Sequence, residues 1–225
     1  MISLTNAGFG YGSEQILRDV TQELPAGSFH FLTGPSGAGK TTLLKMCYLA
    51  LRPQQGKLEV FGQDISSMTR DQVSKMRQKI GVVHQDCQFL NHLTVAENIA
   101  LPLKVSGRNV ADNMDNLADL LSWVGMNKRA DMFPDQLSGG ERQRLALARA
   151  VIMSPDMIIA DEPTGNVDWE MAQRLLTLLI ELNKMGKTIL LATHDLSLIR
   201  AAKGQISAKV LRLKNGHLQL AGAEL

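Results

Sequence analysis

The chain has 225 residues, of which 44% are hydrophobic and 20% charged, and its formal net charge is +2, which suits one large domain with a substantial core. The positive charges are spread out, the two cysteines show no metal-ligand spacing, and no apolar run approaches the roughly 18 residues of a membrane span. The composition thus gives no sign of a nucleic-acid-binding surface, a disulfide framework or a spanning helix. Since the start lacks a signal-peptide pattern, we expect a cytoplasmic chain with two free thiols.

Residues 2–33 alternate apolar and polar positions between glycine clusters, which predicts a few strands joined by turns. Tyr11 lies in the first glycine cluster, where its ring could stack on an adenine. The alternative is a tyrosine that merely belongs to the core or the surface.

The stretch 34–41 reads Gly-Pro-Ser-Gly-Ala-Gly-Lys-Thr and has the spacing of a phosphate-binding P-loop between a strand and a helix. Glycines let successive backbone N–H groups turn toward an anion, and the following helix adds the positive end of its dipole. We expect Lys40 to reach the β- and γ-phosphates of a nucleotide and the Thr41 hydroxyl to bind Mg²⁺. A glycine-rich turn that binds nothing is the alternative. The predicted nucleotide-binding residues of this segment are Gly34, Pro35, Ser36, Gly37, Ala38, Gly39, Lys40, Thr41 and Thr42.

A helix is predicted over residues 42–51, followed by strands at 57–61 and 80–83. Gln85 follows the second of these strands at its C-terminal edge, where ligands sit in open α/β sheets. An amide there could bind Mg²⁺ and orient an attacking water while sensing the γ-phosphate. An isolated glutamine is, however, more commonly an ordinary loop residue.

Residues 90–150 show apolar positions at helical spacing, which indicates an inserted helical subdomain. We expect the segments 89–90 and 101–103 to be exposed and to offer a docking surface for a partner helix.

Residues 137–141, Leu-Ser-Gly-Gly-Glu, precede a further helix, with Ser138 as its N-cap and two glycines that let backbone amides approach an anion. Because 34–41 already form one phosphate cradle, this second one is best explained if it reads the γ-phosphate held by another copy of the chain. A simple helix cap is the alternative.

Residues 157–162 form an apolar run too short for a helix and end in two acids, which predicts a buried parallel strand with both carboxylates at its tip. Asp161 is expected to hold Mg²⁺ and Glu162 to polarise the attacking water. A solvated strand end is the alternative.

The turn 165–168 precedes a helix predicted over 169–185, with Asp168 as its cap. A buried strand at 188–192 leads to His194, which we place beside the two acids, where it could hydrogen-bond the γ-phosphate. A single histidine is, by itself, weak evidence for such a phosphate contact. The remaining strands are predicted near 209–213 and 217–220, with a turn at 215–216.

Taken in order, these motifs resemble the ATP-binding domain of the ABC family, and the resemblance covers essentially the whole chain. It implies an α/β P-loop NTPase with a RecA-like core (about 1–88 and 155–225), an N-terminal antiparallel β subdomain and an inserted α-helical subdomain (about 89–154). It also implies ATP and Mg²⁺ as cofactors and a homodimer that sandwiches two ATPs between the P-loop of one copy and the 137–141 motif of the other. The family roles carry over to Lys40, Gln85, Glu162 and His194 in catalysis, to Thr41, Gln85 and Asp161 as Mg²⁺ ligands, and to Tyr11, residues 34–42, Ser138, Gly139, Gly140 and Glu141 in ATP binding.

Within the family, the segments 160–168 and 192–199 look most like those of bacterial cell-division ATPases. That resemblance implies an integral membrane subunit as partner, force transmission to cell-wall hydrolases, a place on the cytoplasmic face of the inner membrane and no nucleic acid. The sequence departs from the usual pattern at Glu141, where Gln is commoner, at Val167 and at His84. The ATPase of a lipoprotein-release or efflux transporter is an alternative. A soluble ABC protein is a third, although a single cassette without long insertions argues against it.

Overall fold

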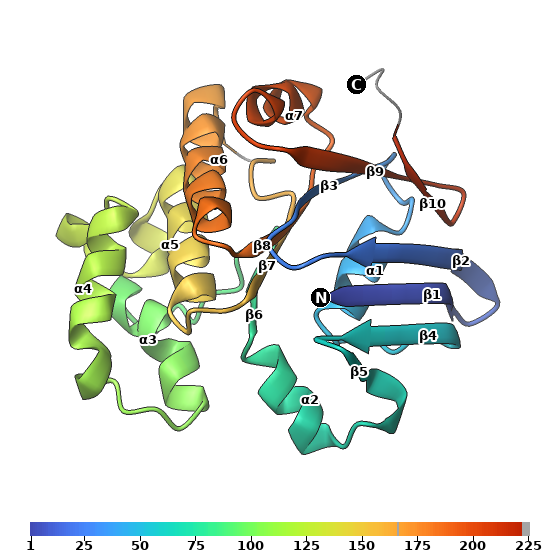
Figure 1. The fold of residues 1–225 in the computed structure, drawn as a ribbon. Helices are drawn as coiled ribbons and strands as arrows, with labels where there is room; N and C mark the ends of the chain where they lie inside the picture. The colour runs from blue at the N-terminus through green and yellow to red at the C-terminus, as the bar shows by residue number, and fades with distance from the viewer. Residues whose placement is uncertain (166, 222–225) are drawn as a thin grey trace.

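The structure, a computed structural model, describes residues 1–165 and 167–221 (Figure 1). Its strands are β1 Ile2–Tyr11, β2 Glu14–Leu24, β3 Phe29–Thr33, β4 Gln55–Val60, β5 Gln63–Asp64, β6 Ile80–Val83, β7 Met157–Asp161, β8 Thr188–Ala192, β9 Ala208–Lys214 and β10 His217–Leu220. The α-helices are α1 Lys40–Cys47, α2 Arg70–Arg77, α3 Val95–Val105, α4 Met114–Trp123, α5 Gly139–Val151, α6 Trp169–Lys184 and α7 Leu196–Lys203. Short 3₁₀ turns lie at Ile65–Ser67, Ala111–Asn113, Asn127–Arg129 and Pro134–Gln136.

The strands form two sheets. An antiparallel sheet has the order β2-β1-β4-β5, and a six-stranded sheet has the order β10-β9-β3-β8-β7-β6. In the six-stranded sheet all neighbours are parallel except β10, which pairs antiparallel with β9. Helices α3 to α6 gather at the left of Figure 1 and the antiparallel sheet lies at the right, so the six-stranded sheet separates two differently built halves.

Three apolar clusters hold these parts together. One contains α1 together with residues of both sheets, and a second lies between the six-stranded sheet and helices α5, α6 and α7. The third joins α3, α4 and α5. Helix α5 belongs to two of them, since Leu147 packs in the second cluster and Leu145 in the third. Because opposite faces of α5 are buried, this helix connects the helical region rigidly to the sheet.

The largest differences between the expected and the observed elements lie at two places. The helix predicted over 42–51 ends at Cys47, because Leu49 adopts a left-handed φ of +66°, which stops a helix much as a terminal glycine does. Helix α7, Leu196–Lys203, was not predicted. Asp195 caps it by accepting hydrogen bonds from the N–H groups of Ser197 and Leu198. The strands expected at 80–83 and 188–192 are confirmed with the same bounds.

The prediction that residues 101–103 are exposed is wrong for Leu103, which is fully buried. Leu103 follows Ile99 by four residues, so both side chains lie on the face of α3 that enters the third apolar cluster. Leu101 and Pro102 are half-buried, and Leu90 is 40% exposed. Of the expected docking surface, Leu90 is thus the most exposed member.

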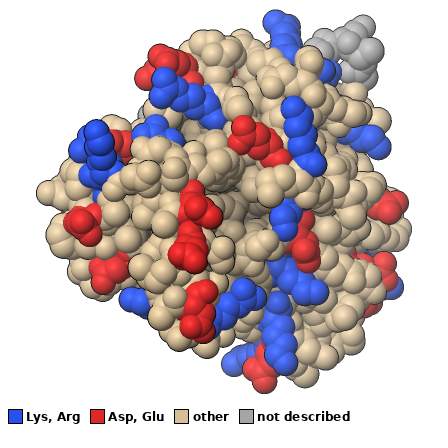
Figure 2. Space-filling model, turned by 60° about the vertical axis from the view of Figure 1, so that its left-hand side comes forward, with Lys and Arg blue, Asp and Glu red and all other residues tan. Residues whose placement is uncertain are grey.

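The surface shown in Figure 2 carries interspersed Lys, Arg, Asp and Glu side chains, without a continuous basic stripe. Within the described ranges, we find no helix whose length and apolarity would let it cross a bilayer. Cys47 and Cys87 are both buried free thiols, as expected.

His30 is a fully buried titratable side chain in β3. Its Nδ1 lies 3.1 Å from the Ser28 hydroxyl, which itself donates to the Pro25 carbonyl, so Nδ1 is assigned as the donor. Nε2 has no hydrogen-bond partner among the described residues. Burial and, secondly, the charge of Lys209 lower the pKa of His30 from 6.5 to about 4. The neutral ring is therefore the form that the fold accommodates.

We expect this histidine to make the fold sensitive to acid. The unfolded chain takes up a proton near pH 6.5 and the folded one near pH 4, so the stabilising contribution is complete above pH 6.5 and is lost as the pH falls toward 4. The loss amounts to up to about 3 kcal/mol. Urea unfolding at pH 7.5 and pH 5 should show a steeper loss for the wild type than for His30→Leu. Equal pH dependence of the two proteins would contradict the assignment.

Candidate nucleotide-binding site

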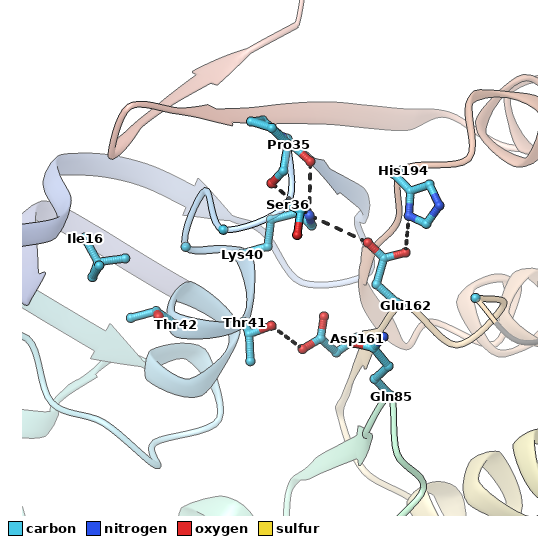
Figure 3. Close-up of a pocket in the computed structure, with 14 residues that line it drawn as sticks. Ile16, Pro35, Ser36, Lys40, Thr41, Thr42, Gln85, Asp161, Glu162 and His194 are labelled. Carbon is cyan, nitrogen blue, oxygen red and sulfur yellow. Dashed lines mark hydrogen bonds and ion pairs between the residues drawn. The ribbon is translucent and has the colours of Figure 1, made fainter. Parts of the chain in front are cut away.

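The ends of four neighbouring parallel strands meet at one edge of the six-stranded sheet. Ala160 of β7 pairs with Val83 of β6 and with Leu191 of β8, so the residues that follow these strands emerge side by side. The 34–41 loop follows β3, the next strand along. Together they enclose a cavity of about 650 Å³ (Figure 3). It is lined by Ile16, Gly34, Pro35, Ser36, Gly37, Gly39, Lys40, Thr41, Thr42, Gln85, Asp161, Glu162, Gly165 and His194.

Two positions of the loop require glycine. Gly39 has a φ of +99° and lies so close to β2 that a Cβ atom would sit 2.7 Å from Ile16 Cγ2. A Cβ atom on Gly34 would collide with the carbonyl oxygen of Leu213 in β9. The loop thus fits between β2 and β9 only with glycine at these positions, which fixes where α1 begins.

Lys40, the first residue of α1, points into the cavity (Figure 3). Its ammonium group donates hydrogen bonds to the carbonyl oxygens of Gly34 at 3.0 Å and Pro35 at 3.3 Å, and it lies 3.7 Å from Oε1 of Glu162. Both charged side chains are 11% exposed. Phosphate oxygens are stronger acceptors than carbonyls, so an ammonium group held in this way can exchange its partners for a bound polyphosphate.

The side chains of Thr41 and Asp161 meet across the cavity. The Thr41 hydroxyl donates to Oδ2 of Asp161 at 2.7 Å, and Oδ1 of Asp161 is buried without a partner in the described part of the chain. Burial, which outweighs the Thr41 hydrogen bond, raises the pKa of Asp161. A hard cation would relieve both the unpaired oxygen and the cost of burying the charge.

The donor set of this cavity fits Mg²⁺. Thr41, Asp161 and Gln85 all line it and offer hydroxyl, carboxylate and amide oxygens, the ligands that this ion prefers together with substrate phosphates. Over residues 1–165 and 167–221 we find no cluster of three or more His, Cys, Asp or Glu that could form a metal centre of its own.

Glu162 is held in an unusual conformation directly after β7. Its φ of +47° is in the left-handed region, which costs a non-glycine residue energy and is typical of functional sites. Its N–H donates to the Ala192 carbonyl at 3.0 Å, and its Oε2 lies 2.8 Å from Nδ1 of His194. The carboxylate therefore sits between Lys40 on one side and His194 on the other (Figure 3).

The loop that follows Gln85 is fastened to helix α5. Arg149 donates to the carbonyl oxygens of Cys87 and Gln88, and its guanidinium lies 4.8 Å from the centre of the Phe89 ring. Arg142, two turns earlier on α5, lies 5.4 Å from the same ring. Because both arginines contact one aromatic ring, the loop and the helix are held together by cation–π contacts as well as hydrogen bonds.

Several residues predicted to bind ATP do not line the cavity of their own chain. Tyr11 is 50% exposed, packs edge-on against Phe9 and does not line the cavity. Ala38 lines a neighbouring pocket instead. Ser138, Gly139, Gly140 and Glu141 form the start of α5, where Ser138 is the N-cap as expected, and none of the four is among the residues lining the cavity of their own chain.

The cavity lining also includes Ile16 and Gly165, which no sequence motif identifies as site residues. Ile16 belongs to a plain alternating strand, and its role arises only because Gly39 lies against it. Asp168 caps α6 as predicted, accepting a hydrogen bond from the N–H of Met171. Asn166, part of the predicted turn 165–168, lies outside the described residues.

Residues 17–165 match the family model described as ABC transporter. The chain belongs to the ABC transporter ATP-binding family. The cell division ATP-binding protein FtsE of Escherichia coli K12 is 42% identical to this cassette over 207 residues, which are 92% of this chain and 91% of the relative. FtsE of Haemophilus influenzae is 38% identical over 97% of this chain and 100% of its own, and FtsE of Bacillus subtilis is 38% identical over 85% and 84%.

Solved structures agree with this assignment. The dimeric ATP-binding cassette MJ0796, in a post-hydrolysis state bound to ADP and Pi, is similar to this chain with a TM-score of 0.88 and 30% identity over 100% of both chains. A further dimeric structure of MJ0796 has a TM-score of 0.86 at 32% identity, over 97% of both chains. The predicted α/β P-loop fold of an ABC ATPase is therefore confirmed, and the family supports ATP binding and hydrolysis by this cassette. The roles of the individual residues stay predictions.

Proposed function

We propose that this chain is a Mg²⁺-dependent ATPase subunit that dimerises with ATP and drives a conformational change in an integral membrane subunit of the FtsX type. It would act on the cytoplasmic face of the inner membrane, in cell division and the activation of cell-wall hydrolases. The observation that carries this proposal is the similarity to FtsE, which spans nine-tenths or more of both chains in the Escherichia coli and Haemophilus influenzae proteins.

The contacts around the cavity support a role for each side chain. Lys40 binds the phosphates, and Thr41, Gln85 and Asp161 hold Mg²⁺, which supplies neutralising charge on the phosphate oxygens. Glu162 is the general base that orients a water and accepts its proton. His194, whose Nδ1 lies 2.8 Å from Glu162, fixes the orientation of that carboxylate and presents its exposed ring to the γ-phosphate.

A second copy would complete the site. Because Ser138, Gly139, Gly140 and Glu141 do not line their own cavity, we infer that they contact the nucleotide of the partner copy, as the dimeric relatives suggest. Tyr11, whose ring is half exposed, would stack on the adenine. The helical region, about 89–154, would act as one subdomain that carries the start of α5, since its third apolar cluster gives it a core of its own.

The test is ATP hydrolysis by the chain co-expressed with its membrane subunit, compared with the chain alone and with a Glu162→Gln complex. We expect activity that requires the membrane subunit and disappears in the variant. Equal activity without the subunit would instead indicate a soluble ATPase. ATP-dependent movement of a substrate by the complex would favour a lipoprotein-release or efflux transporter of the LolD or MacB type.

A further inference from the structure

The start of helix α5 carries an ion pair in addition to its cap. Oε2 of Glu141 accepts a hydrogen bond from the Ser138 N–H at 2.9 Å, and the Ser138 hydroxyl accepts one from the Glu141 N–H at 3.3 Å. The other carboxylate oxygen, Oε1, accepts from Nε of Arg129 at 2.9 Å. Arg129 lies twelve residues earlier, in the turn after α4, and also contacts the sulfur of Met132. Both oxygens of Glu141 are thus engaged, one by the helix start and one by a cation.

Glu141 is a negative charge at this helix start. The Ser138 hydrogen bonds, and then Arg129, hold the pKa of Glu141 below its usual range, so the carboxylate is ionised at neutral pH. A helix start attracts anions through its first N–H groups, which include those of Gly139 and Gly140, and through the positive end of its dipole. A carboxylate in the first turn opposes that attraction.

We propose that Arg129 is a charge-compensating residue, which pairs with Glu141 so that the start of α5 can accept the γ-phosphate held by a second copy of this chain. The inference rests on the proposed function, because the second copy supplies the phosphate. A glutamine at position 141 could make the same capping hydrogen bonds without the charge and would need no compensation. The need for Arg129 is thus tied to the acid that this chain carries.

The sign of the effect follows from Coulomb's law. Without Arg129, the Glu141 carboxylate would keep its full charge at the helix start that the proposal assigns to the polyphosphate. In a partly solvated contact, two like charges at about 4 Å repel by at least roughly the energy of a tenfold change in affinity. Salt would screen this repulsion, because the Debye length falls from about 10 Å at 0.1 M to about 3 Å at 1 M. If Arg129 only stabilised the local structure, the dimerisation defect of an Arg129 variant would be neither rescued by Glu141→Gln nor reduced by salt.

The experiment uses full-length chains that carry Glu162→Gln to stop hydrolysis, and it measures by sedimentation velocity the ATP concentration at which half the protein is dimeric. We expect Arg129→Gln to raise that concentration about tenfold at low salt. Adding Glu141→Gln should bring it back to within about threefold of the parent, and Arg129→Lys should stay close to the parent because the charge is kept. The tenfold defect should shrink at high salt. Lys57→Gln, which removes an exposed ion pair with Glu59 in the antiparallel sheet, is the matched control.

Each outcome decides the inference. Unchanged dimerisation of Arg129→Gln would overturn it. A defect that Glu141→Gln does not rescue would also overturn it, since Arg129 would then contact the phosphate directly or brace the turn, and thermal unfolding of Arg129→Gln distinguishes these two causes. If the parent itself fails to dimerise with ATP, the proposed function fails, and the inference with it.

Discussion

Replacing Glu162 with Gln is expected to lower kcat for ATP hydrolysis by about 10² to 10⁴-fold, the usual contribution of a general base. Glutamine keeps the shape of the side chain between Lys40 and His194 but cannot accept a proton from water. ATP binding should become tighter, because Lys40 no longer shares its charge with a carboxylate 3.7 Å away. The variant should therefore accumulate as an ATP-bound dimer. Phosphate release and gel filtration with and without ATP measure the two effects.

A matched control for Glu162→Gln is Glu59→Gln, the same chemical change in the antiparallel sheet. It should leave hydrolysis within twofold of the wild type. If Glu162→Gln kept more than a tenth of the wild-type kcat, Glu162 would not be the base. If it were inactive but stayed monomeric with saturating ATP, the role of Ser138 and Gly140 in a second copy would be contradicted.

The sequence alone predicts those cavity residues that directly follow parallel strands. The sequence predicts that Asp161, Glu162 and His194 lie together, because the C-terminal ends of parallel strands share one edge of a sheet. The structure adds the pairing itself, with His194 against Glu162 and Thr41 against Asp161. No local pattern indicates which acid meets which partner, since this depends on the strand register and on the left-handed turn at Glu162.

The features that the sequence does not predict are contacts between segments that lie apart in the chain. Ile16 reaches the cavity because Gly39 packs against β2, and Leu103 is buried because α3 packs against α5. The pairing of Arg129 with Glu141 joins a turn to a helix twelve residues on. Such contacts arise from tertiary packing, which helical or strand periodicity does not encode.

Replacing Lys40 with Ala is expected to weaken ATP binding by roughly 100-fold, since charge-assisted hydrogen bonds to phosphates would be lost. Lys45→Ala is the matched control, because Lys45 lies on the same helix α1 but does not line the cavity. It should change ATP affinity by no more than about threefold. Calorimetric titration with Mg·ATP measures both variants. Comparable affinities for the two would contradict a phosphate-binding role for Lys40.

The Lys40 and Glu162 variants should shift ATP affinity in opposite directions, and this makes their combination informative. In the structure the Lys40 ammonium is shared between two loop carbonyls and the Glu162 carboxylate, so a bound phosphate has to compete with that carboxylate. Once Lys40 is Ala, the competition is gone, and Glu162→Gln should then relieve only direct repulsion between the carboxylate and the phosphates. A double-mutant cycle on ATP affinity separates the two contributions. If Glu162→Gln tightened binding equally with and without Lys40, the ion pair between the two residues would play no part in nucleotide affinity.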